Sequence, residues 1–177
     1  MNAIRRATAA ATLVLSSVAL SAASAASIEA SFIEGAPKDR FVIRNSGPCP
    51  LAASRITIDL NGSRGALIFD TTGAGAGVEV FQPLEIVEGR AQLTSVPKVR
   101  DGDRSIALDV RVLSPREAVA FTIDVDDTLT NSALGQIRVA DSEIEGAVLR
   151  VETAGDTRTA TFDQSSAARI DLPGCTS

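Results

Sequence analysis

The chain has 177 residues, 45% of them hydrophobic and 22% charged, with a formal net charge of −5. It contains no His, Trp or Tyr, so Ser-His-Asp and Cys-His catalytic arrangements and His-based zinc sites are excluded. An acidic chain without clustered Lys or Arg also argues against nucleic acid and anionic membranes as partners.

The N-terminus has the pattern of a secretory signal peptide. Arg5 and Arg6 precede an apolar run over residues 7–20, and small residues suited to cleavage fill positions 21–26. We therefore expect a leader over 1–26 and a periplasmic or secreted domain over 27–177, with no membrane insertion after cleavage. An uncleaved anchor is the alternative, but the run is shorter than the roughly 20 residues of a spanning helix.

Removal of the leader makes the chain more acidic. Without Arg5 and Arg6, 15 of the 17 basic residues remain against 22 acidic ones, a net charge of −7. About 150 residues form one ordinary domain with enough apolar content for a core.

Cys49 and Cys175 are the two cysteines of the chain. An even number in an oxidising compartment favours a disulfide, which here would tie the early part of the domain to its end. Such a bond contributes about 4 to 5 kcal/mol in the chain-entropy model. Two separate free thiols are the alternative.

Short segments in which apolar and polar residues alternate recur along the mature chain, as in half-buried β-strands. The predicted strands cover residues 28–33, 41–43, 56–60, 66–69, 78–81, 84–87, 106–112, 117–128, 136–140, 147–151, 157–162 and 167–172. Turn residues separate them at intervals of about ten, and no convincing amphipathic helix is present. The pattern predicts a single all-β domain, a β-sandwich of the Ig-like or jelly-roll-like kind.

Three turns stand out between these strands. Asn61-Gly62 predicts a hairpin between the strands at 56–60 and 66–69, because both residues accept positive φ. Ala154-Gly155-Asp156 predicts a turn between 147–151 and 157–162. The glycine-rich segment 71–77 lacks the spacing of a phosphate-binding loop and is expected to be a flexible connection.

The clearest hint of chemistry lies on the strand at 117–128. Val119, Phe121, Ile123 and Val125 would face the core, while Asp124 and Asp126 fall on the opposite face, which we expect to be exposed to solvent. Asp127 follows at the exit of the strand.

These three aspartates are the candidate metal ligands. Calcium takes six to eight oxygen ligands, and Asp124, Asp126 and Asp127 could supply several, with Asp101 or Asp103 if that turn lies close. The spacing is not that of an EF-hand, since Leu129 stands where the loop needs Gly. A solvated acidic strand end without metal is the alternative.

The chain resembles exported bacterial proteins labelled aggregation factor core. The resemblance rests on Phe32-Ile33-Glu34-Gly35-Ala36-Pro37-Lys38-Asp39-Arg40-Phe41, Leu67-Ile68-Phe69-Asp70-Thr71-Thr72, Val80-Phe81-Gln82-Pro83 and the strand from Phe121 to Asp127. It covers most of the mature chain, and it implies a calcium-dependent adhesive role.

Together these observations lead us to expect a non-enzymatic, exported β-sandwich that interacts with a protein or another component of the cell surface or matrix. One alternative is an enzyme that acts on a glycan through paired carboxylates, which do not require His. The other is a periplasmic accessory protein without a ligand. The lack of Trp and Tyr argues against sugar binding by aromatic stacking, but leaves recognition by hydrogen bonds open.

Overall fold

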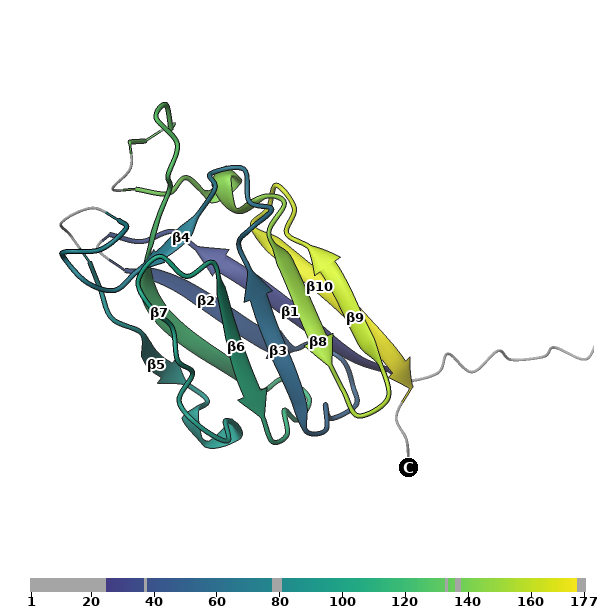
Figure 1. Cartoon of the computed structure of the whole chain (residues 1–177). Coiled ribbons are helices and arrows are strands. Elements are labelled where there is room, and N and C mark those ends of the chain that lie inside the picture. Colours follow the sequence, from purple (N-terminus) through teal and green to yellow (C-terminus); the bar gives the residue numbers. More distant parts are fainter. Residues whose placement is uncertain (1–24, 37, 78–80, 133, 136–137, 175–177) are drawn as a thin grey trace, which may run out of the picture.

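The structure is a computed structural model that describes residues 25–36, 38–77, 81–132, 134–135 and 138–174 (Figure 1). Among these residues there are ten β-strands and two short 3₁₀ helices, η1 (Arg90–Gln92) and η2 (Asp141–Ile144). No helix in this part of the chain has the length and apolar character needed to cross a membrane.

The strands form two sheets that pack face to face (Figure 1). The first sheet has the order β10 (Ala167–Gly174), β1 (Ala25–Ile33), β2 (Asp39–Asn45), β7 (Ala118–Asp126) and β4 (Ile68–Asp70), and β5 (Glu85–Glu88) also pairs with β7. The second sheet has the order β6 (Ser105–Val110), β3 (Ser54–Asp59), β8 (Val148–Glu152) and β9 (Thr157–Thr161). All these strand pairs are antiparallel, and the predicted all-β sandwich is confirmed.

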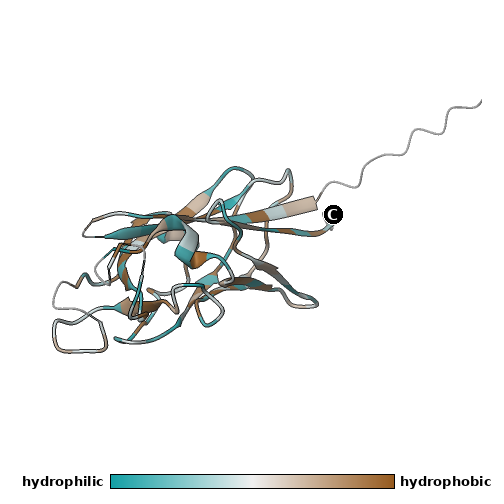
Figure 2. Cartoon of the chain, turned by 90° about the horizontal axis from the view of Figure 1, so that it is seen from above, coloured by the Kyte–Doolittle hydropathy of each residue, from teal (hydrophilic) through white to brown (hydrophobic). Residues whose placement is uncertain are grey.

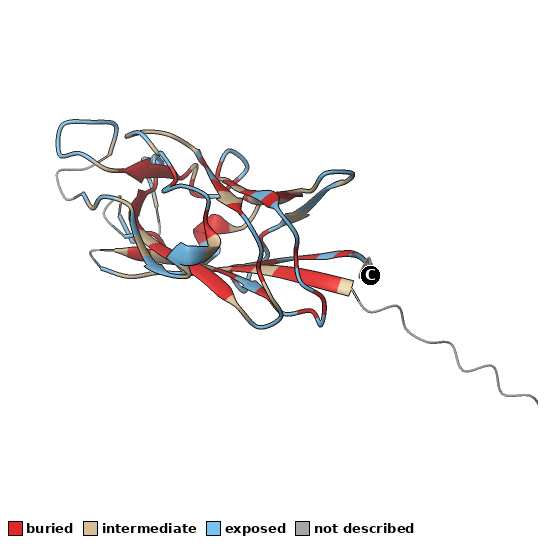
Figure 3. Cartoon of the chain, turned by 90° about the horizontal axis from the view of Figure 1, so that it is seen from below, coloured by how far each residue is buried: buried red, intermediate tan, exposed pale blue. Residues whose placement is uncertain are grey.

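The core lies between the sheets and is built from the inward positions of the alternating strands. Hydrophobic residues concentrate on the strands, and the loops at the ends are mostly hydrophilic and exposed (Figures 2 and 3). Phe41 of β2 is fully buried, and its ring centroid lies 5.0 Å from that of Phe121 on β7 and 6.2 Å from that of Phe69 on β4. Burial of one such side chain stabilises the fold by about 1.5 to 3 kcal/mol. The Phe69 ring therefore anchors the short strand β4 and fixes the position of the residue that follows it, Asp70.

Most of the predicted strands are confirmed, with ends that differ by a few residues. The turn at 154–156 joins β8 to β9 as expected, since Glu152 pairs with Thr157. The predicted strand at 136–140 is wrong for its described residues 138–140, which belong to no strand, and residues 136–137 lie outside the described residues. The predicted strand at 78–81 falls mainly on residues 78–80, which also lie outside.

The predicted hairpin at Asn61-Gly62 is wrong. β3 pairs with β6 and β8 in the second sheet, whereas β4 pairs with β7 in the first. Neither Asn61 nor Gly62 has the positive φ that a tight two-residue hairpin turn requires. The segment crosses from one sheet to the other, because the apolar face of β4 is needed against Phe41 in the core.

Two predictions fall at the chain ends. Residues 1–24 lie outside the described residues, and β1 begins at Ala25, two residues before the predicted start of the mature domain. Cys49 is buried, but Cys175 lies outside the described residues, so the disulfide stays a prediction.

Candidate metal centre

The strand β7 is buried on both of its faces, so the prediction of a solvent-exposed face is wrong. Asp124 is only 6% exposed and Asp126 only 1%. The loop over residues 71–77 contributes to this burial at Asp126. A Cβ atom on Gly77 would lie 2.3 Å from Asp126 Oδ2 and 2.4 Å from Asp70 Oδ2, so the backbone of this loop lies directly against the carboxyl groups.

Three aspartates meet under this loop. Asp70 at the end of β4 pairs with Asp124 of β7 in the antiparallel ladder, and Asp126 lies two residues further along β7. Each offers one carboxylate oxygen, and these three oxygens lie within 4.8 Å of one another. Like charges directly opposite each other across two strands are destabilising, so this arrangement calls for a compensating charge.

The described residues supply little compensation. Neither Asp70 nor Asp124 forms an ion pair with a described Lys or Arg. Asp70 is fully buried; its Oδ1 accepts a hydrogen bond from the Thr72 amide at 3.3 Å, whereas its Oδ2 has no hydrogen-bond partner. A buried carboxylate oxygen without a partner carries the full cost of its lost hydration.

The electrostatics of the cluster follow from this burial. Burial, reinforced by the negative charge of Asp126, raises the pKa of Asp124 to about 7. Burial also raises the pKa of Asp70 to about 7, and the adjacent carboxyl of Asp101 adds to the shift. Asp39, at the start of β2, has its pKa raised to about 7, mainly by burial, although its carboxylate accepts hydrogen bonds from the amides of Gly35 and Val125.

Asp101 holds the loop in place over the cluster. Its Oδ1 accepts hydrogen bonds from the amides of Thr71 and Thr72, and its Oδ2 accepts one from the amide of Ala76 at 2.6 Å. These amides lower the pKa of Asp101 to about 2, the Thr71 amide most strongly, so this residue is ionised at neutral pH. The segment that we expected to be a flexible connection is therefore tied to the acidic cluster along its length.

The other predicted residues lie at the edge of the cluster. Asp127 is buried, and its Oδ1 accepts a hydrogen bond from the Leu129 amide, whereas its Oδ2 has no hydrogen-bond partner. It is not one of the three aspartates whose oxygens converge. Asp103 closes the turn that follows Val99, because its carboxylate accepts a hydrogen bond from the Arg100 amide.

Sequence reasoning found Asp124 and Asp126 but missed Asp70. The signal was present, since Asp70 ends an apolar run and directly precedes the glycine-rich loop. It was overlooked because the strand that carries it was paired with the wrong neighbour. Asp70 approaches Asp124 only when β4 joins β7.

Buried carboxylates in this arrangement have two ways to lose their excess charge. They can take up protons, as the raised pKa values indicate, or they can bind a cation that prefers oxygen ligands. Comparison with protein-family models, curated proteins and solved structures finds no match for this chain. The chemistry of this centre therefore has to be argued from its own residues.

Proposed function

We propose that the domain binds a divalent cation, with calcium as the first candidate, between Asp70, Asp124 and Asp126. The observation that carries this proposal is the convergence of three buried carboxylate oxygens within 4.8 Å. The buried Oδ2 of Asp70 supports it independently. This oxygen has no hydrogen-bond partner, and both it and Asp126 Oδ2 lie within 2.4 Å of the position that a Cβ atom on Gly77 would take.

Calcium suits this set of ligands better than zinc or magnesium. Zinc favours His and Cys ligands, and the chain has no His. Magnesium demands near-ideal octahedral geometry and usually keeps several waters, whereas calcium accepts six to eight oxygens in variable geometry. Water and neighbouring oxygen atoms would supply the ligands beyond the three carboxylates.

The biological role that we propose is a non-enzymatic, exported module that interacts with a protein or another component of the cell surface or matrix. The leader pattern at 1–26 supports export. The resemblance to aggregation factor core proteins supports a surface role in which calcium stabilises the domain.

A disulfide between Cys49 and Cys175 belongs to the same proposal. Gly174 at the end of β10 pairs with Ala25, and Gly47 packs against the backbone of Ala25 and Ser27. The end of the described chain is therefore close to the segment that carries Cys49. This proximity supports the pairing.

The geometry favours cation binding over the glycan-hydrolysing alternative. Retaining glycosidases hold two carboxyl groups about 5 to 5.5 Å apart on either side of an accessible bond. Here the carboxylate oxygens are closer, and the aspartates that bear them are almost completely buried. An accessory protein without a ligand remains the other alternative, and it predicts no response to calcium.

The test is thermal unfolding of the mature, oxidised protein in excess calcium and in chelator. A cation present at 100 times its dissociation constant should stabilise the fold by about 2.7 kcal/mol. For a domain of this size, the midpoint should then rise by roughly 5 to 10 °C. Equal midpoints in calcium and chelator would refute the metal centre.

The variant Asp124→Asn separates a bound cation from general charge screening. It should abolish the calcium response and, because it removes a buried negative charge, stabilise the calcium-free protein above pH 7. The matched control is Asp141→Asn, since Asp141 is exposed in η2 and distant in sequence from the cluster. A control variant that lost the response as well would show that calcium acts on the overall charge.

A further inference from the structure

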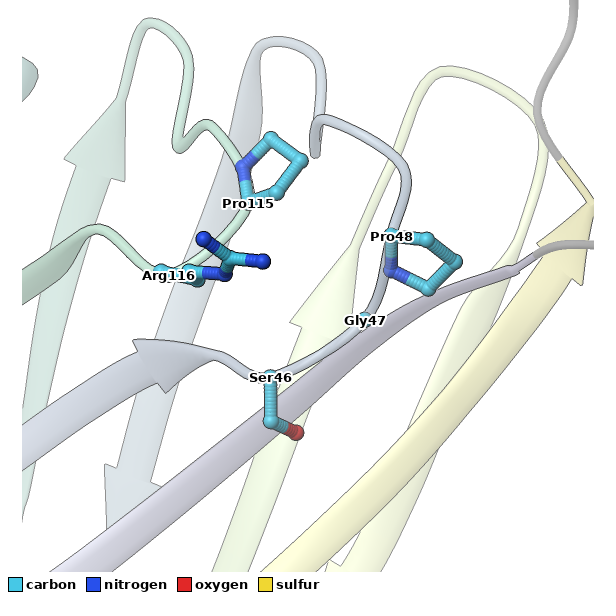
Figure 4. Close-up of a pocket in the computed structure, with 5 residues that line it drawn as sticks. All are labelled: Ser46, Gly47, Pro48, Pro115 and Arg116. Carbon is cyan, nitrogen blue, oxygen red and sulfur yellow. The ribbon is translucent and has the colours of Figure 1, made fainter.

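A second candidate binding site lies at the opposite end of the first sheet. A pocket of about 430 Å³ is lined by Ser46, Gly47, Pro48, Pro115 and Arg116 (Figure 4). The first three residues follow the end of β2, and the last two precede the start of β7. Its volume is within the range of small-molecule sites.

The walls of this pocket are held firmly. The buried side chain of Asn45 donates to the carbonyl oxygens of Cys49 and Leu113 and accepts from the amide of Gly47. A Cβ atom on Gly47 would lie 2.4 Å from the backbone of Ala25, so the loop packs tightly on β1. A fixed pocket loses little conformational entropy when a ligand binds.

Arg116 is the one charged side chain among the described residues that line this pocket. Its side chain projects from the loop before β7 toward the segment with Gly47 and Pro48 (Figure 4). Among the described residues its guanidinium forms no ion pair or hydrogen bond, and its backbone has a φ of 71°, which is uncommon for a residue with a side chain. The Arg44 guanidinium holds this conformation by donating to the Arg116 carbonyl at 2.9 Å.

The backbone of the pocket offers acceptors but no free donors. The amide of Ser46 already donates to the Ser27 carbonyl, and the amides of Gly47 and Arg116 donate to the side chain and the carbonyl of Asn45. Pro48 and Pro115 have no N–H. No described donor reaches the carbonyl oxygens of Gly47, Pro48 and Pro115. A peptide backbone would find no partner here for its carbonyl groups, whereas a ligand with hydroxyl groups could donate to these oxygens.

We propose that this pocket binds a sugar acid, a uronic acid residue with one carboxylate and several hydroxyl groups. One unpaired guanidinium matches a single carboxylate in charge and in its planar, bidentate geometry. The hydroxyl groups donate to the free carbonyl oxygens, and the ring packs between the aliphatic rings of Pro48 and Pro115. This recognition does not require the aromatic residues that the chain lacks.

The experiment is an amide chemical-shift titration of the ¹⁵N-labelled, mature, oxidised protein, with chelator present so that no metal can bridge ligand and protein. The probes are glucuronate, its neutral methyl ester, and the α-amide of N-acetylaspartate, which has one side-chain carboxylate and no sugar ring. Glucuronate should shift the amides of Ser46, Gly47, Arg116 and Glu117, and the other two probes should bind about tenfold more weakly or not at all. Equal binding of the methyl ester would overturn the role of the carboxylate, and equal binding of the α-amide of N-acetylaspartate would overturn the assignment to a sugar.

Arg116→Gln should weaken glucuronate binding at least about tenfold, the loss expected for a charge-assisted contact. Arg116→Gly, which accepts the positive φ without strain, gives the same test if the first variant fails to fold. The control is Arg100→Gln, an exposed arginine without an ion-pair partner among the described residues, and it should bind as the unmodified protein does. Unchanged binding in both Arg116 variants would overturn the proposal.

Discussion

Buried polar side chains at the two ends of β2 and β7 differ in how fully their hydrogen bonds are satisfied. At one end, Asn45 is fully buried and both atoms of its amide are paired twice: Oδ1 accepts from Ser27 and Gly47, and Nδ2 donates to Cys49 and Leu113. At the other end, Asp70 is just as buried and Asp124 is 6% exposed, but the described residues give them no cation and leave Asp70 Oδ2 without a partner.

The difference separates a structural role of Asn45 from the proposed cation-binding role of the aspartates. A buried amide with all its hydrogen bonds made rigidifies the loops around it and needs nothing from solution. Buried carboxylates without compensation cost stability, and the proposed cation would offset that cost. Mutations at the two ends should therefore respond differently to calcium.

The largest expected effect is at the structural end. Asn45→Ala should destabilise the domain by roughly 3 to 5 kcal/mol, because it leaves several buried backbone groups unpaired at once. The loss should be the same in calcium and in chelator, as measured by thermal or denaturant unfolding. Asn61→Ala is the matched control: Asn61 is exposed and, among the described residues, its side chain bonds only to Asp59, so a change within about 0.5 kcal/mol is expected. A calcium-dependent effect of Asn45→Ala would contradict the separation of roles.

The next effect is expected from pH at the acidic end. The pKa values of Asp39, Asp70 and Asp124 are about 7 in the folded protein, against 3.8 as their ordinary value. The folded state therefore binds more protons than the unfolded state between these values, so the calcium-free protein should lose stability as pH rises from about 4 to 7 and change little above about pH 8.

Saturating calcium should remove most of this slope. Metal binding requires deprotonated carboxylates, and the same groups are already deprotonated in the unfolded state above about pH 4, so the stability of the calcium-bound protein should change little over the same pH range. Unfolding midpoints at pH 5, 6, 7 and 8, in calcium and in chelator, measure both slopes. Parallel slopes in the two conditions would show that the raised pKa values have no connection with a cation site.

The fold could be predicted from local patterns because apolar and polar residues alternate within each strand. Ile56 and Ile58 alternate with polar residues as a half-buried strand requires, and both are fully buried. The pairing of strands depends instead on contacts between distant segments. The turn chemistry of Asn61-Gly62 gave the wrong neighbour for β4, because the burial of Phe69 against Phe41 outweighs a local hairpin preference.

The candidate site was only half predictable for the same reason. Asp124 and Asp126 lie on one strand, where the two-residue period alone puts them on one face. Asp70 joins them through strand pairing, and the loop that covers them has a sequence that reads as a plain connection. The burial of an acidic strand face cannot be read from that strand, because a different segment provides the cover.

The smallest expected effect comes from a substitution in the loop over residues 71–77, which lies over the acidic cluster. Gly77→Ala would place a methyl group within 2.4 Å of carboxylate oxygens of Asp70 and Asp126, so the loop must shift away from the cluster. We expect calcium affinity to fall about five- to tenfold, roughly 1 kcal/mol, as measured by calorimetric titration. Gly155→Ala is the matched control, since a Cβ atom there would meet nothing within 4 Å. If Gly77→Ala bound calcium as tightly as the control while Asp124→Asn did not bind it, the carboxylates would form the site without the loop, and the glycine-rich segment would serve only to let the chain pass over them.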